Sequence, residues 1–74
     1  MLKQKAGEYA GVIWNALNGT DGMTVKELKK NTVKPEEKNK LTDKDLFLGL
    51  GWLLKEEKIL VQELEGGELF VKLI

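Results

Sequence analysis

Histidine, cysteine, serine and arginine are all absent from this sequence of 74 residues. Without histidine and cysteine, the chain lacks the imidazole and thiolate ligands on which transition-metal sites depend. Without serine, cysteine and histidine, the usual nucleophile–base pairs of covalent catalysis cannot be built. We therefore expect a protein that is not an enzyme, with no catalytic residues, no cofactor and no metal.

Long apolar segments are also absent. No stretch is long enough to span a membrane, and the N-terminal MLKQKAGEY lacks the apolar region of a signal peptide. We expect a cytoplasmic protein without membrane contact. The length predicts a single domain over residues 1–74, near the lower limit for a chain that folds without disulfides or metal.

Charge is balanced overall but unevenly distributed along the chain. Twelve lysines match twelve acidic residues. Residues 26–42 contain six lysines and three glutamates, whereas residues 43–74 contain four lysines and seven acidic residues. The middle of the chain is therefore basic and its C-terminal part is acidic.

The spacing of apolar residues predicts three helices, over about 3–17, 25–32 and 43–56. The second helix begins at a predicted capping box of Thr24 and Glu27, and Thr42 caps the third. On the first helix, the predicted buried stripe consists of Ala6, Tyr9, Ala10, Ile13 and Leu17.

The third helix carries enough apolar residues for a wide core face. We expect that face to consist of Leu46, Phe47, Leu50, Leu53 and Leu54. The opposite side is expected to carry Lys44, Asp45, Leu48, Trp52 and Lys55. Gly49 and Gly51 each weaken the helix by about 1 kcal/mol relative to alanine, and they would let another backbone approach closely.

Residues from about 58 to 74 alternate around Gly66-Gly67, which predicts a β-hairpin. A two-residue turn would place Leu60, Leu64, Leu69, Val71 and Leu73 on its buried face. Because Glu65 would then face Glu68, a longer turn is the alternative. We also expect a short strand near Met23 that pairs with the hairpin.

This order of elements resembles the winged helix-turn-helix superfamily, and within it a family of small stand-alone bacterial domains of uncharacterised function. The resemblance rests on GMTVKEL at 22–28, LGWL at 50–53 and KI at 58–59. It implies an α+β fold with three helices, a small antiparallel sheet and a C-terminal hairpin wing. It also implies a DNA-binding, transcription-associated architecture in which the third helix enters the major groove.

Double-stranded DNA is accordingly one expected partner. Phosphate contacts would come from Lys26, Lys29, Lys30 and Lys40, and the groove-facing surface would carry Lys44 and Leu48. Binding would be weak and salt-sensitive, and it would be poorly sequence-specific because no arginine is available to pair with guanine. The alternative is that these lysines only make the surface soluble.

A protein–protein interaction module, including a homodimer, is the alternative function. The face that would contact bases also carries Leu48 and Trp52, and tryptophan is enriched at protein contacts. Trp14 lies beside Gly7 and Gly11, where a second helix could pack. The candidate interface residues are therefore Trp14, Leu48 and Trp52. Core packing is the other interpretation for both tryptophans.

Overall fold

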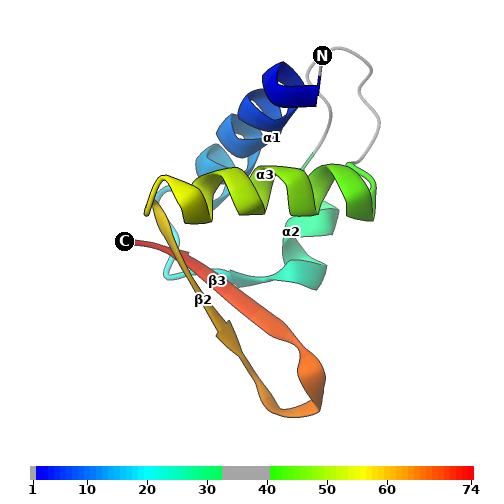
Figure 1. Cartoon of the computed structure of the whole chain (residues 1–74). Helices are drawn as coiled ribbons and strands as arrows, with labels where there is room; N and C mark the ends of the chain where they lie inside the picture. Colours follow the sequence, from blue (N-terminus) through cyan, green and yellow to red (C-terminus); the bar gives the residue numbers. More distant parts are fainter. Residues whose placement is uncertain (1, 33–40) are drawn as a thin grey trace.

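A computed structural model describes residues 2–32 and 41–74 of the chain, and Figure 1 shows their arrangement. The helices are α1 (Leu2–Leu17), α2 (Val25–Asn31) and α3 (Asp43–Lys55). The strands are β1 (Met23–Thr24), β2 (Ile59–Glu63) and β3 (Leu69–Leu73), with a short 3-10 turn, η1 (Glu65–Gly67), between the last two. This arrangement confirms the predicted α+β fold. Candidate Lys40 lies outside the described residues.

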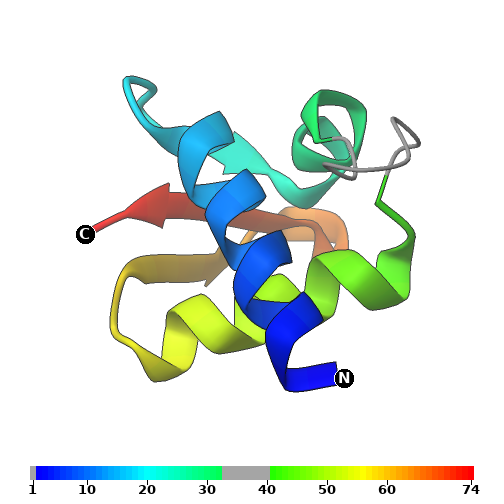
Figure 2. The ribbon, with the colours of Figure 1, turned by 90° about the horizontal axis from the view of Figure 1, so that it is seen from above.

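The three strands form one antiparallel sheet in the order β1-β3-β2. Met23 pairs with Val71 and Thr24 with Phe70, so the short strand expected near Met23 is present. The β2–β3 hairpin forms the wing, which extends below the helices in Figure 1. Seen from above, α1 crosses over α3 and the base of the sheet (Figure 2).

The predicted register of the hairpin was wrong by one residue. Ile59 pairs with Leu73, and Glu63 pairs with Leu69. This shift reverses the faces of β2, because successive side chains point to opposite sides of a strand. Ile59 is therefore buried, whereas Leu60 and Leu64, which we expected on the buried face, are exposed.

The cause of the shift is a longer turn, which was the stated alternative. Residues 64–68 connect the strands, and the amide of Leu64 donates to the carbonyl of Glu68 at 2.6 Å. Gly66 and Gly67 both have positive φ, at 83° and 79°, a conformation that glycine adopts without strain. Glu65 and Glu68 are thereby kept out of a cross-strand pair.

The core lies between α1, α3 and the base of the sheet. The entire predicted stripe of α1 is buried, and it meets Leu28 of α2, Leu41 and the base of the wing. The buried hydrophobic residues are Ala6, Tyr9, Ala10, Ile13, Leu17, Leu28, Leu41, Leu46, Leu50, Leu53, Ile59 and Val71.

Gly49 sets how closely α3 packs against α1. A Cβ at this position would lie 2.6 Å from Cδ1 of Ile13 and 2.9 Å from the backbone carbon of Tyr9. No larger residue fits there, so the expected close approach of another backbone is confirmed at Gly49. At Gly51 nothing lies within 4 Å of such a Cβ.

Because of this contact, the buried face of α3 differs from the face that we predicted. Gly49 and Asp45 are buried together with Leu46, Leu50 and Leu53. Phe47 and Leu54, which we assigned to the core, are instead 50% and 49% exposed. The prediction assumed that the largest apolar side chains of α3 mark its buried face. In the structure, the buried face of α3 is centred near Gly49.

Candidate interaction surface

Two capping boxes position the helices that form the outer surface. At α2, the amide of Glu27 donates to Oγ1 of Thr24 at 3.2 Å, and the amide of Thr24 donates to Oε1 of Glu27 at 3.0 Å. At α3, Thr42 and Asp45 form the same reciprocal pair. Both boxes match the cap residues expected from the sequence, and they fix where each helix begins.

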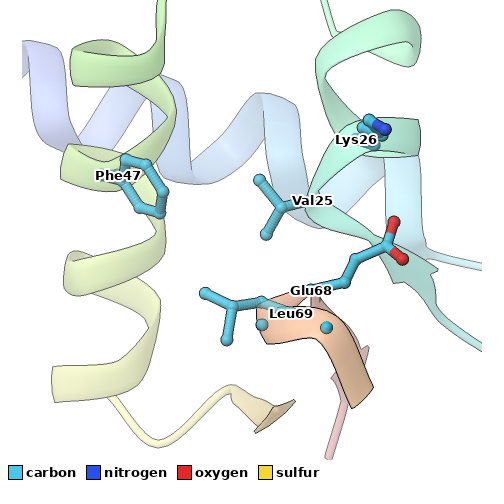
Figure 3. Close-up of a pocket in the computed structure, with 7 residues that line it drawn as sticks. Val25, Lys26, Phe47, Glu68 and Leu69 are labelled. Atoms are coloured by element: carbon cyan, nitrogen blue, oxygen red, sulfur yellow. The ribbon is translucent and has the colours of Figure 1, made fainter. Parts of the chain in front are cut away.

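A hollow of about 380 Å³ lies between the start of α2, the first half of α3 and the tip of the wing. We call it the α3–wing groove; its lining consists of Val25, Lys26, Phe47, Gly66, Gly67, Glu68 and Leu69. In Figure 3 the apolar side chains of Phe47, Val25 and Leu69 face this space from three different elements. The groove is therefore an apolar surface built by α2, α3 and β3 together.

The exposed side of α3 continues this apolar surface beyond the groove. Phe47, Gly51 and Leu54 are four and three residues apart, so they lie on one face of the helix. All three positions are exposed, as is Lys44 one turn earlier. We call these four residues the α3 outer strip. Large apolar side chains of this kind on a helix surface are typical of contact sites.

The wing brings negative charge to the edge of the groove. Glu68 lines it directly, and Glu65 belongs to the same exposed turn. Glu63 is paired with Leu69, so its side chain lies on the same face of the sheet as this groove residue. A DNA backbone placed along the wing would meet like charge at these positions.

Three basic residues gather around a second hollow, and one of them, Lys26, also lines the α3–wing groove. Lys26, Lys29 and Lys30 line this hollow, of about 260 Å³, together with Leu41. We call these three residues the lysine corner. Nζ of Lys29 lies 2.6 Å from Oδ1 of Asp43, which links α2 to the first turn of α3. The two side chains are 43% and 68% exposed. Because solvent screens the pair, it contributes less than about 1 kcal/mol.

Trp14 of α1 and Trp52 of α3 are not among the residues that line the α3–wing groove. Trp14 and Trp52 line a hollow of about 420 Å³ beside Gly7 and Gly11. Trp52 is half-buried and packs against the core, and Trp14 is 38% exposed. Leu48 is also half-buried. A protein contact at these three residues stays a prediction.

Phe47 and Leu54 are the surface residues that sequence reasoning missed. The thirteen residues of α3 include seven large apolar ones, which is more than one face of a single helix can bury. That excess was visible in the sequence and indicated that some had to be exposed. Which ones are exposed depends on the approach of α1 at Gly49.

Comparison with known families identifies the chain. A family model described as winged helix-turn-helix domain (DUF2582) matches residues 1–73, so the chain belongs to this family. No curated protein matches it. The fold commonly binds DNA and generally has no enzymatic activity. Within residues 2–32 and 41–74, none of the helices has the length and apolar character needed to cross a bilayer.

Proposed function

We propose that this domain is a non-catalytic protein-interaction module that docks through the α3–wing groove and the α3 outer strip. The observation that carries the proposal is the exposure of Phe47 and Leu54, each about half accessible, on the outer face of the third helix. In DNA-binding relatives of this fold that helix enters the major groove. Here its outer face offers large apolar side chains to a partner.

The chemistry of this face is poorly suited to reading DNA. Base edges are recognised mainly through hydrogen bonds, and the α3 outer strip supplies one donor side chain, that of Lys44. Phe47 and Leu54 cannot replace a guanidinium or an amide in that role. The glutamates of the wing would also oppose the phosphate backbone. Burial of the same apolar side chains against a protein would instead be favourable.

Affinity capture from the host cell tests this function with a matched pair of variants. Phe47→Glu places a charge in the groove, and Leu60→Glu places the same charge on an exposed leucine of the wing. We expect the captured partner to be lost with Phe47→Glu and retained with Leu60→Glu. Equal capture by both variants and the unaltered domain would refute docking at this face.

DNA binding is a second candidate function, and one observation favours it. The lysine corner places three cations around one hollow, with Lys44 exposed on the neighbouring helix. Contact with about four phosphates would give a salt dependence of log affinity with a slope of about −3 to −4. Such binding would be weak and would carry little sequence information.

A titration with duplex DNA at increasing salt tests the second candidate. Lys29→Glu combined with Lys30→Glu should abolish binding through the lysine corner, whereas Lys72→Glu on the outer face of the wing is the control. If the double variant binds DNA as well as the unaltered domain does, the lysine corner is not the binding site.

A further inference from the structure

The edge of the sheet formed by β2 is unprotected. In the part of the chain that the structure describes, no strand pairs with the outer side of β2. Proteins usually protect such an edge with lysine, proline or a bulge. Residues 59–64, ILVQEL, contain neither lysine nor proline, and each residue of β2 has one partner in β3 without a bulge. The other edge strand, β1, has only two residues. We call the outer side of β2 the free edge.

The hydrogen bonds to β3 determine which residues of β2 face the free edge. An antiparallel ladder alternates between residue pairs that exchange hydrogen bonds and pairs that do not. At the two ends of the hairpin, the amide of Leu64 donates to the carbonyl of Glu68, and the amide of Ile74 donates to the carbonyl of Lys58. The even-numbered residues of β2 are therefore the bonded ones. The amides and carbonyls of its odd-numbered residues point outward, where an extended backbone is the matching partner.

We infer that the free edge pairs with the same edge of a second copy of this chain, with the two β2 strands antiparallel about a two-fold axis at Gln62. A two-fold interface uses one surface twice, so that surface has to be complementary to itself. About this axis, Val61 of one copy lies opposite Glu63 of the other. Because both residues point their backbone groups outward, each such pair would exchange two hydrogen bonds, and the pair occurs twice.

The exposed leucines of the wing favour this occupant and this axis. Leu60 and Leu64 are each 41% exposed, and they stand two residues before and two residues after Gln62. Leu64 continues the extended backbone of β2, with a φ of −96° and a ψ of 171°. The two-fold axis therefore places Leu60 of one copy opposite Leu64 of the other, twice. Side chains come closest in pairs of this kind, which are not hydrogen-bonded, so each leucine would be covered by its counterpart.

Glu63 and Gln62 fit the antiparallel direction. Glu63 is the only charged residue of segment 59–64. In a parallel pair the two copies of Glu63 would lie side by side, whereas in the antiparallel pair they take diagonal positions, about 7 to 8 Å apart. The two copies of Gln62 would lie opposite each other at the axis, and their side-chain amides can each donate and accept a hydrogen bond.

The small size of this contact predicts a weak dimer. Its two short strands bury less than the roughly 800 Å² per partner of a standard interface. We therefore expect dissociation constants of roughly 0.1 to 1 mM. At a total chain concentration of about 2 mM, such constants leave about 15 to 40% of the chain as monomer. The dimer would thus form and separate as the concentration changes.

Amide-resolved NMR of the full chain between about 20 µM and 2 mM tests the inference. The amide protons of Val61 and Glu63 should move downfield as the concentration rises, because they gain hydrogen bonds, and the shifts should fit an equilibrium between monomer and dimer. Phe47 and Leu54 on α3 should not shift. Constant shifts at Val61 and Glu63 up to the highest concentration would overturn the second copy as occupant of the free edge.

Two substitutions at Glu63 separate backbone pairing from the charge of the side chain. Glu63→Pro removes an outward amide without removing a bond to β3, a position at which an edge strand tolerates proline. This variant should raise the dissociation constant at least about 10-fold. Glu63→Gln removes the same charge but retains the amide, and it should not raise the dissociation constant. Equal dissociation constants for the two variants would refute backbone pairing at this edge. Unchanged amide shifts outside the wing show that each variant is folded.

A mixture of two variants tests the antiparallel register. Leu60→Glu and Leu64→Lys should each weaken self-pairing, by at least about 5-fold. An equimolar mixture of the two chains should associate more tightly than either alone, because the new carboxylate of one chain would meet the new ammonium of the other across the axis. No gain on mixing would overturn the register.

Leu60→Glu also distinguishes this inference from the proposed docking function. The side chain of Leu60 lies on the opposite face of β2 from that of Glu63, and hence from the α3–wing groove. Leu60→Glu should therefore lose self-pairing while it retains the partner captured through Phe47. Each proposal can thus fail without the other.

Discussion

Replacing Gly49 with alanine should destabilise the fold, whereas the same replacement at Gly51 should stabilise it. Both residues lie in α3, two positions apart, so the chemical change and its effect on the unfolded chain are the same. Only their surroundings differ. The pair therefore isolates the packing of α3 against α1 from the general effect of removing a helix glycine.

The magnitudes follow from the space around each position. At Gly49 the new methyl group would lie 2.9 Å from the backbone of Tyr9 and 3.0 Å from that of Ala10, which cannot move aside like the tip of a side chain. Overpacking of this kind costs about 1 to 3 kcal/mol, and the gain in helix propensity of about 1 kcal/mol offsets part of it. At Gly51 only the gain applies.

Thermal and urea unfolding at low micromolar concentration would measure the difference without a contribution from association. Because the gain in helix propensity is common to both variants, we expect them to differ by the overpacking cost of about 1 to 3 kcal/mol, which for a domain of this size separates their melting temperatures by roughly 5 to 20 °C. If Gly49→Ala were as stable as Gly51→Ala, the close contact between α1 and α3 would be refuted.

Three further predictions concern single features of the fold. Gly22→Ala should lower the free energy of unfolding, measured with urea, by at least about 2 kcal/mol. The reason is that Gly22 has a φ of 122° and a Cβ there would lie 2.6 Å from Cζ of Phe70. A loss below about 0.5 kcal/mol would contradict this prediction. Thr42→Ala should lower the free energy of unfolding by about 1 kcal/mol through loss of the α3 cap, whereas Thr42→Ser should retain most of it. A double-mutant cycle on Lys29 and Asp43 should give a coupling below about 1 kcal/mol that disappears in high salt; a larger, salt-independent coupling would show that the pair is not a surface interaction.

Local signals in the sequence were sufficient to predict the order of the elements. The capping residues Thr24 and Thr42 mark where α2 and α3 begin, because a hydroxyl that serves an orphan amide acts within one helical turn. The buried stripe of α1 follows from spacing alone, since this helix has one clearly apolar face. These features depend on residues close together in the chain.

The outer face of α3 and the register of the wing depend on contacts between distant residues. Phe47 was assigned to the core because the helix has apolar residues on several sides, and only the approach of α1 decides which side is buried. Leu60 was assigned to the buried face because a two-residue turn was assumed. One added turn position reversed every side chain of β2, since strand periodicity is two.

The corrected face of α3 changes the comparison between the two candidate functions. On the predicted face, Trp52 and Leu48 would have formed the contact surface, and both turn out to be half-buried. Phe47 and Leu54 are more exposed, and Phe47 lines the groove that the wing and α2 complete. The lysine corner lies at the α2 end of this surface. Lys26 lines both hollows, but docking at Phe47 and Leu54 and phosphate contact at Lys29 and Lys30 involve separable residues.

Amide-resolved NMR of the labelled domain during titration with a random-sequence duplex at low salt tests the central claim most directly. With the domain at constant concentration, our account predicts no shifts for Phe47, Gly51 and Leu54, and shifts at the lysine corner alone if DNA binds at all. Shifts that extend from Lys44 to Leu54 and disappear on adding salt would show that α3 enters the DNA groove. That result would contradict a protein-docking function for the outer face of this helix.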